Sequence, residues 1–155
     1  MVRSTWGRRG IDAATRWRDN HNMIVERLDH VNIITDRLAE TARFYAELLD
    51  LEERDGPPPL RPEQVRWMYD HAGNAILHLN SVDCPRAFDR DVDPGSETGA
   101  IHHVALRCTN FAEVQARLDA RGADYRVNDV PSISLKQIFT ADPNNVLLEL
   151  NFFGG

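Results

Sequence analysis

Short stretches in which apolar and polar residues alternate recur along the chain after Met23. A period of two is typical of strands with one buried face, because successive side chains point to opposite sides of a sheet. The pattern predicts strands over residues 30–34, 65–69, 75–79, 103–107, 135–140 and 146–152. Residues 1–22 show no sustained apolar pattern, so we interpret them as an N-terminal appendage to one domain that spans residues 23–155.

A helical period follows the strands that begin at residues 30 and 103. Apolar residues recur there at steps of three and four, as expected of a helix that packs one side on a core. They are Leu38, Ala42, Tyr45, Leu48 and Leu49 in the first helix and Phe111, Val114 and Leu118 in the second. Gly122 supplies a C-terminal stop for the second helix.

The chain matches itself at a nearly constant offset. Residues 29–40 (DHVNIITDRLAE) align with residues 102–113 (HHVALRCTNFAE), and residues 70–80 (DHAGNAILHLN) align with residues 141–151 (ADPNNVLLELN). An internal repeat indicates a duplicated structural unit. We therefore expect an α+β domain made of two units, residues 27–82 and 99–153, joined by a linker over residues 83–98.

Composition adds limits on the class of protein. The 155 residues are 42% hydrophobic and carry a formal net charge of −6, which argues against a nucleic-acid partner because such partners need a concentrated basic surface. No apolar run approaches the roughly 18 residues of a membrane span, and the first residues lack the apolar centre of a secretory signal. Two cysteines without CxxC spacing suit a reducing compartment. We expect a cytoplasmic protein with no membrane partner.

Residue types that bind metals stand at equivalent positions of the repeat. His30 corresponds to His103 on the first strand of each unit, and His78 corresponds to Glu149 on the last. A buried carboxylate is costly unless it is paired or binds a cation, which would explain Glu149 between leucines. The sequence therefore predicts a divalent metal held by His30, His103 and Glu149. Fe, Mn, Zn, Ni and Co are all compatible with imidazole and carboxylate ligands.

The role of His78 stays open among three readings: a fourth metal ligand, a general base beside the metal, or a polar residue that lines the pocket. The other histidines are interpreted as ordinary satisfied or exposed residues, as a lone histidine usually is; they are His21, His71 and His102.

Strand alternation also proposes a pocket lining, since residues two and four positions from a ligand share its face. This criterion selects as candidate substrate-binding residues Asn32, Asn80, Arg107 and Asn151. Arg107 could grip a carboxylate or phosphate on a small-molecule substrate, or could be a solvent-facing strand residue.

The repeat and its ligand positions resemble the vicinal oxygen chelate superfamily, which includes glyoxalase I, methylmalonyl-CoA epimerase, fosfomycin-resistance transferases, bleomycin-binding proteins and extradiol dioxygenases. The match covers residues 27–153, and residues 100–106 with Asn110 look like the glyoxalase I segment that opens the second unit. The resemblance implies tandem βαβββ units whose antiparallel-rich mixed sheets curl around a metal-binding cavity. It assigns as ligands His30, His78, His103 and Glu149, and it implies a homodimer.

The chain departs from two members of that superfamily. Bacterial glyoxalase I typically carries a glutamate where this chain has His78, which alters the charge balance and the proton shuttle. The extradiol dioxygenase signature is partly present in residues 138–143, but Phe139 replaces its acid–base tyrosine, and residues 129–134 lack the histidine that supports the site in that family.

The sequence thus favours a glyoxalase-like, metal-dependent isomerase, lyase or epimerase. The cation would chelate substrate oxygens and stabilise an enediolate while Glu149 or His78 moves the proton. The alternative is an Fe(II)-dependent extradiol-type dioxygenase, since His30, His103 and Glu149 form a 2-His-1-carboxylate set. A drug-sequestering protein of the bleomycin-resistance kind is a third reading. Such binders need no metal ligands, which argues against it.

Overall fold

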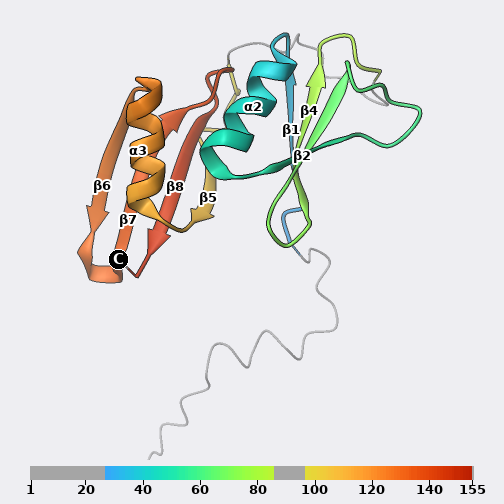
Figure 1. Cartoon of the computed structure of the whole chain (residues 1–155). Helices are drawn as coiled ribbons and strands as arrows, with labels where there is room; N and C mark the ends of the chain where they lie inside the picture. Colours follow the sequence, from blue (N-terminus) through green and yellow to red (C-terminus); the bar gives the residue numbers. More distant parts are fainter. Residues whose placement is uncertain (1–26, 86–96, 155) are drawn as a thin grey trace, which may run out of the picture.

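The computed structural model describes residues 27–85 and 97–154. The proposed appendage (residues 1–22), His21 and most of the proposed linker lie outside the described residues. The first unit contains β1 (Val31–Thr35), α2 (Leu38–Leu49), β2 (Glu52–Asp55), β3 (Val65–Tyr69) and β4 (Ala75–Ser81). The second contains β5 (Val104–Cys108), α3 (Phe111–Arg121), β6 (Tyr125–Val130), the 3-10 turn η1 (Pro131–Ile133), β7 (Leu135–Ala141) and β8 (Leu147–Phe153). Figure 1 shows the two units side by side, with the sheet of the first unit on the right and that of the second on the left.

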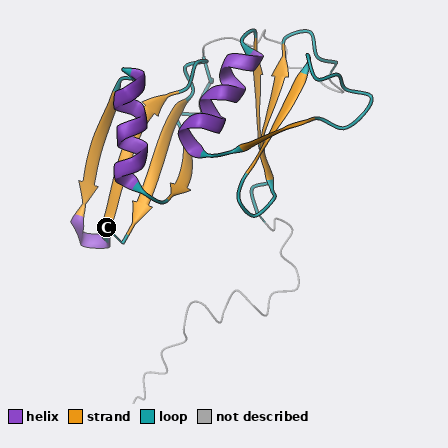
Figure 2. Cartoon of the chain, in the orientation of Figure 1, coloured by secondary structure: helices purple, strands orange, loops and turns teal. Residues whose placement is uncertain are grey.

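Each unit forms its own four-stranded sheet with the same topology. The strand orders are β1-β4-β3-β2 and β5-β8-β7-β6, and the first and last strands of each unit pair in parallel while the other neighbours are antiparallel. Figure 2 shows one helix beside each mixed sheet. The expected α+β fold of two tandem βαβββ units is confirmed.

Alternation found three strands of each sheet but missed β2 and β6, one edge strand of each. All four residues of β2 are exposed, and most of β6 is exposed, so neither strand has an apolar side to alternate with a polar one. The register accounts for part of the change in the repeat offset. Val31 pairs with Leu77 and Val104 pairs with Leu148, so the first unit has two more residues between these partners than the second. A bulge between Met68 and Tyr69 supplies one of the two.

A single hydrophobic core lies between the helices and one face of each sheet. Leu77 and Leu79 of β4 and Leu148 and Leu150 of β8 are buried in this core with residues of α2 and α3. Because side chains alternate along a strand, the residues between these leucines point to the opposite face, away from the helices. His78 and Glu149 are on that face. Neither described helix has the length and apolar character needed to traverse a lipid bilayer.

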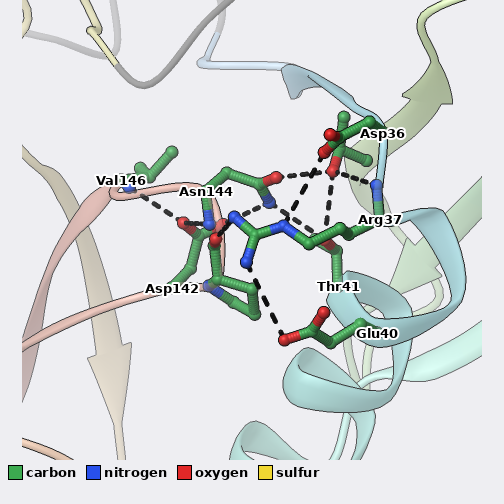
Figure 3. Close-up of polar contacts among 9 residues, drawn as sticks. Asp36, Arg37, Glu40, Thr41, Asp142, Asn144 and Val146 are labelled. Atoms are coloured by element: carbon green, nitrogen blue, oxygen red, sulfur yellow. Dashed lines mark hydrogen bonds and ion pairs between the residues drawn. The ribbon is translucent and has the colours of Figure 1, made fainter.

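A polar junction ties the turn between β7 and β8 to the first unit (Figure 3). The Oδ1 atom of Asp142 accepts the backbone N–H groups of Asn144 and Val146, both at 2.8 Å. Across the junction, Asn144 Nδ2 donates to Thr41 Oγ1 at 2.9 Å, and the guanidinium of Arg37 donates to the carbonyl oxygen of Pro143. These bonds fix the second unit against the start of α2.

Candidate metal centre

The first unit brings His30 and His78 together on the face of its sheet that points away from α2. His30 lies one residue before β1, and His78 stands on β4 opposite Trp67 of β3. The imidazole of His78 is stacked between two rings. The Trp67 indole lies 4.1 Å away with an interplanar angle of 3°, and the His30 imidazole lies 3.8 Å away at 18°. Burial, and then the nearby charge of His30, lowers the pKa of His78, so this imidazole is neutral at pH 7.

The parallel stack restricts how the two imidazoles can act together. A ring nitrogen binds a metal at about 2.0–2.1 Å along a lone pair that lies in the ring plane. Two nearly parallel rings whose centroids are 3.8 Å apart cannot direct such lone pairs at one ion. One of the rings would have to rotate for both His30 and His78 to bind the same metal.

The second unit pairs His103 with Glu149 on the corresponding face. His103 lies one residue before β5, and Glu149 stands on β8 opposite Ala105 of β5. The His103 Nε2 atom is 3.1 Å from Glu149 Oε2, and the Glu149 side chain is only 16% exposed. A largely buried carboxylate with an imidazole nitrogen against one oxygen is a donor set that a divalent cation fits.

Two amides hold the other oxygen of Glu149. Its Oε1 atom accepts hydrogen bonds from Gln137 Nε2 at 2.7 Å and from Asn151 Nδ2 at 2.9 Å. The sequence placed Asn151 on this face but did not select Gln137. The alternation of apolar and polar residues along β7 is only a weak indication that Gln137 lies on this face. The position of Gln137 opposite Asn151 depends on the pairing of β7 with β8.

In each half-site, the histidine that precedes the first strand of its unit contacts the residue immediately before it. His30 Nδ1 donates to Asp29 Oδ2 at 2.8 Å, and His103 Nδ1 lies 3.0 Å from His102 Nδ1. The hydrogen bond with His30 lowers the pKa of Asp29. Engaging Nδ1 leaves Nε2 as the nitrogen for a metal, which is how outer partners commonly orient ligand histidines. His102, interpreted from the sequence as an ordinary residue, therefore supports His103.

The structure does not bring the two pairs into one cluster. Within residues 27–85 and 97–154, no group of three or more His, Cys, Asp or Glu side chains is placed to hold a metal. We call His30 with His78 the first half-site and His103 with Glu149 the second half-site. A single chain holds both half-sites, one on each sheet.

The candidate substrate-binding residues lie on the same faces as the half-sites. Asn32 pairs in register with His78, and the guanidinium of Arg107 lies 4.7 Å from the ring centroid of Phe153. Asn80 Oδ1 is buried and has no hydrogen-bond partner among the described residues. Asn151 is engaged on both sides of its amide, by Gln137 and Glu149.

A cavity of about 490 Å³ lies elsewhere, between the end of α2, the turn after β3, and β5 with the start of α3. None of the four candidate ligands lines it. Four of its charged groups are paired, since Arg117 binds Asp50 and Glu113 and the carboxylate of Asp70 accepts from Asn74, and the candidate substrate-binding residue Arg107 also lines it. The half-sites therefore remain the better candidate for chemistry.

Comparison with solved structures gives the same fold at low sequence identity. A virulence protein from Salmonella typhimurium is 15% identical with a TM-score of 0.61, over 85% of this chain and 100% of that one. A glyoxalase family protein from Bacillus anthracis is 17% identical with a TM-score of 0.61, over 84% and 97%. The fosfomycin resistance protein FosX from Listeria monocytogenes is 15% identical with a TM-score of 0.60, over 84% and 96%.

FosX has also been crystallised, as a mutant, with Mn(II) and a dihydroxypropylphosphonic acid. No curated protein matches the chain. The family model described as the Glyoxalase/Bleomycin resistance protein/Dioxygenase superfamily matches residues 27–150, which include both half-sites. The chain belongs to this superfamily.

Proposed function

We propose that this chain is a metal-dependent enzyme of the glyoxalase type that acts on a small molecule with adjacent oxygens. The ligands are His30, His103 and Glu149. The observation that carries the proposal is the second half-site, where an imidazole nitrogen and a carboxylate oxygen lie 3.1 Å apart, with no other polar partner among the described residues. Two ligand atoms about 2.1 Å from one cation and at right angles are about 3.0 Å apart, so this spacing fits a shared ion.

When bound, the cation would polarise the substrate oxygens and stabilise negative charge that develops on them. The chain's own residues would supply proton transfer. His78 is neutral because burial lowers its pKa, and a neutral imidazole accepts a proton. Its stack against Trp67 fixes the ring plane. We assign His78 to proton transfer beside the metal, with Glu149 as the second candidate, in an isomerase, lyase or epimerase reaction.

The half-sites would be completed across a homodimer, with the first half-site of one copy facing the second half-site of the other. Two observations support this arrangement. β1 and β5 are edge strands, so each has a side beside its ligand histidine that pairs with no other described strand. Leu28 and Ile101, which stand two residues before His30 and His103, are 78% and 64% exposed. Large exposed apolar residues beside free edges favour an interface between copies.

The test is metal content. The purified chain, reconstituted with Mn(II), Fe(II), Zn(II), Ni(II) or Co(II), should retain one of these ions after desalting. His103→Ala and Glu149→Ala should each lose most of it, because each removes a ligand. His71→Ala is the control, since His71 lies outside both half-sites. Elemental analysis that finds wild-type content in the His103→Ala and Glu149→Ala variants would contradict the proposal.

The second candidate is an Fe(II)-dependent dioxygenase, favoured by the 2-His-1-carboxylate ligand type. Phe139 stands opposite Glu149 in the β7–β8 register and offers no hydroxyl for proton handling. Oxygen uptake with catechols after anaerobic reconstitution with Fe(II) would favour this candidate over proton transfer alone.

A further inference from the structure

We infer that Gln137 is a positioning residue that holds Glu149 so that only its Oε2 atom is available to a cation. The inference rests on the proposed function, because it assigns how Glu149 acts as a ligand. It predicts monodentate ligation through the oxygen that faces His103.

The two oxygens of Glu149 have different surroundings. Oε1 receives two hydrogen bonds, from Gln137 Nε2 at 2.7 Å and from Asn151 Nδ2 at 2.9 Å. Oε2 faces His103 Nε2 at 3.1 Å. Amide donors on Oε1 occupy the lone pairs that a bidentate carboxylate would use for the metal. The carboxylate is therefore turned with Oε2 toward the cation.

The orientation of Gln137 is itself fixed from the edge of the sheet. Its side chain is buried among β6, β7 and β8, and its Nε2 atom also donates to Asn151 Oδ1 at 2.9 Å. Its Oε1 atom accepts from Asn128 Nδ2 at 2.7 Å. If the Gln137 amide turned by 180°, its carbonyl oxygen would face the Glu149 carboxylate. Its NH2 group would then face the NH2 group of Asn128. Asn128 thus keeps the donor end of Gln137 on Glu149.

The duplicated unit supplies an internal comparison. Gln137 pairs in register with Asn151, and the residue that pairs with the corresponding Asn80 is Val65. Without an amide there, Asn80 Oδ1 is buried with no hydrogen-bond partner in the described ranges. His78, which corresponds to Glu149 in that unit, is an imidazole rather than a carboxylate. The amide network therefore accompanies the carboxylate ligand and is absent from the described residues around its counterpart.

The experiment is a titration of the full chain with Mn(II), followed by the electron paramagnetic resonance signal of the free ion. Gln137→Leu should weaken Mn(II) binding about 10–100-fold, the usual cost of losing an outer partner of a metal ligand. Asn128→Asp should weaken it too, because an acceptor at position 128 attracts the donor end of Gln137 away from Glu149. The added negative charge alone would strengthen cation binding, so a loss identifies the orientation effect.

Gln115→Leu is the matched control, since Gln115 donates to Tyr125 on the α3 side of the sheet and lies outside the half-sites. Should Gln137→Leu fail to fold, Asn128→Asp still decides the question, because Asn128 is exposed on an edge strand. A Gln137→Leu effect that is equally large in a Glu149→Asp background would overturn the inference, because the shorter carboxylate is out of reach of Gln137.

The outcomes separate the two proposals. If the chain binds neither Mn(II) nor Zn(II), or if Glu149→Gln binds them as tightly as wild type, the proposed metal site is wrong. If Glu149→Gln loses binding while Gln137→Leu and Asn128→Asp match Gln115→Leu, the metal site stands and the positioning role of Gln137 is wrong.

Discussion

Tyr45 and Asp142 form a buried contact between the two units that neither residue type reveals in the sequence. Tyr45 is fully buried on α2, and its hydroxyl donates to Asp142 Oδ2 at 3.1 Å. Asp142 is only 5% exposed, yet its carboxylate also accepts two backbone N–H groups. The apolar period of α2 identified Tyr45 as a core residue. That period contains no information about which acceptor the hydroxyl meets, since Asp142 lies 97 residues away.

Tyr45→Phe should destabilise the fold by about 1–2 kcal/mol at pH 7, because it removes a donor from a buried carboxylate. Urea unfolding followed by circular dichroism measures the difference. Tyr125→Phe is the control, since the Tyr125 hydroxyl donates to Asp119 at an exposed site. Equal costs for the two variants would contradict a special role for the buried contact.

The same contact has a pH dependence. Burial, and then the charge of Asp142, raises the pKa of Tyr45 well above its usual value. Below about pH 10 the phenol is protonated in both the folded and the unfolded chain. At higher pH the unfolded chain releases a proton that the folded chain retains, so the contribution of Tyr45 is lost as pH rises. The stability advantage of wild type over Tyr45→Phe should therefore shrink above about pH 10 in the same urea measurement.

At the scale of elements, α3 supports the end of α2. Arg117 Nη1 donates to the carbonyl oxygens of Glu47 and Leu48 at 3.1 and 3.3 Å, and to Asp50 Oδ1 at 2.8 Å. Carbonyl groups in the last turn of a helix lack partners within the helix, so a cation there satisfies them. The last turn of α2 contains no basic residue of its own. The sequence predicted both helices, but not that one helix would cap the other.

Arg117→Ala should cost about 1 kcal/mol of stability, because hydrogen bonds to carbonyl groups are lost together with a partly exposed ion pair. Arg126→Ala is the control, since Arg126 is exposed and forms no hydrogen bond or ion pair with the residues that the structure describes. Thermal or urea unfolding measures both variants. High salt should reduce only the ion-pair part of the Arg117 contribution. A variant as stable as Arg126→Ala would show that the cap is dispensable.

At the scale of the whole molecule, the ligands that the repeat predicts to share one metal lie in two separate half-sites, one on each unit. Each unit repeats a pair of ligand types on the face opposite its helix, and the described part of one chain contains no group of three potential ligands. A second copy of the chain is therefore part of the proposed site. That proposal predicts that variants damaged in different half-sites complement each other when they form a heterodimer.

Co-expression of His30→Ala chains with His103→Ala chains should restore about half of the wild-type metal content per heterodimer. One of its two sites then combines the intact first half-site of one chain with the intact second half-site of the other. Each variant alone should bind little metal. Tagged heterodimers purified through two affinity steps and analysed for metal provide the measurement.

His103→Ala with Glu149→Ala is the matched control pair, because both substitutions damage the second half-site and no combination is intact. A site built within one chain would give no restoration in either mixture. Restoration in both mixtures would mean that the ligands are other residues.

The sequence by itself determined the duplication, three strands of each sheet, both helices and the face on which His30, His78, His103 and Glu149 lie. The duplication is visible because the chain matches itself, and the strands, helices and faces follow from local periodicity. The edge strands β2 and β6 carry no apolar face, so only pairing with β3 and β7 defined them.

Only the tertiary structure decided which side chains meet. The stack of Trp67, His78 and His30, the hold of Gln137 on Glu149 and the separation of the half-sites all depend on strand register and on the placement of one unit against the other. Contacts between residues distant in sequence are set by the packing of the whole core, and no local pattern of residues specifies that packing.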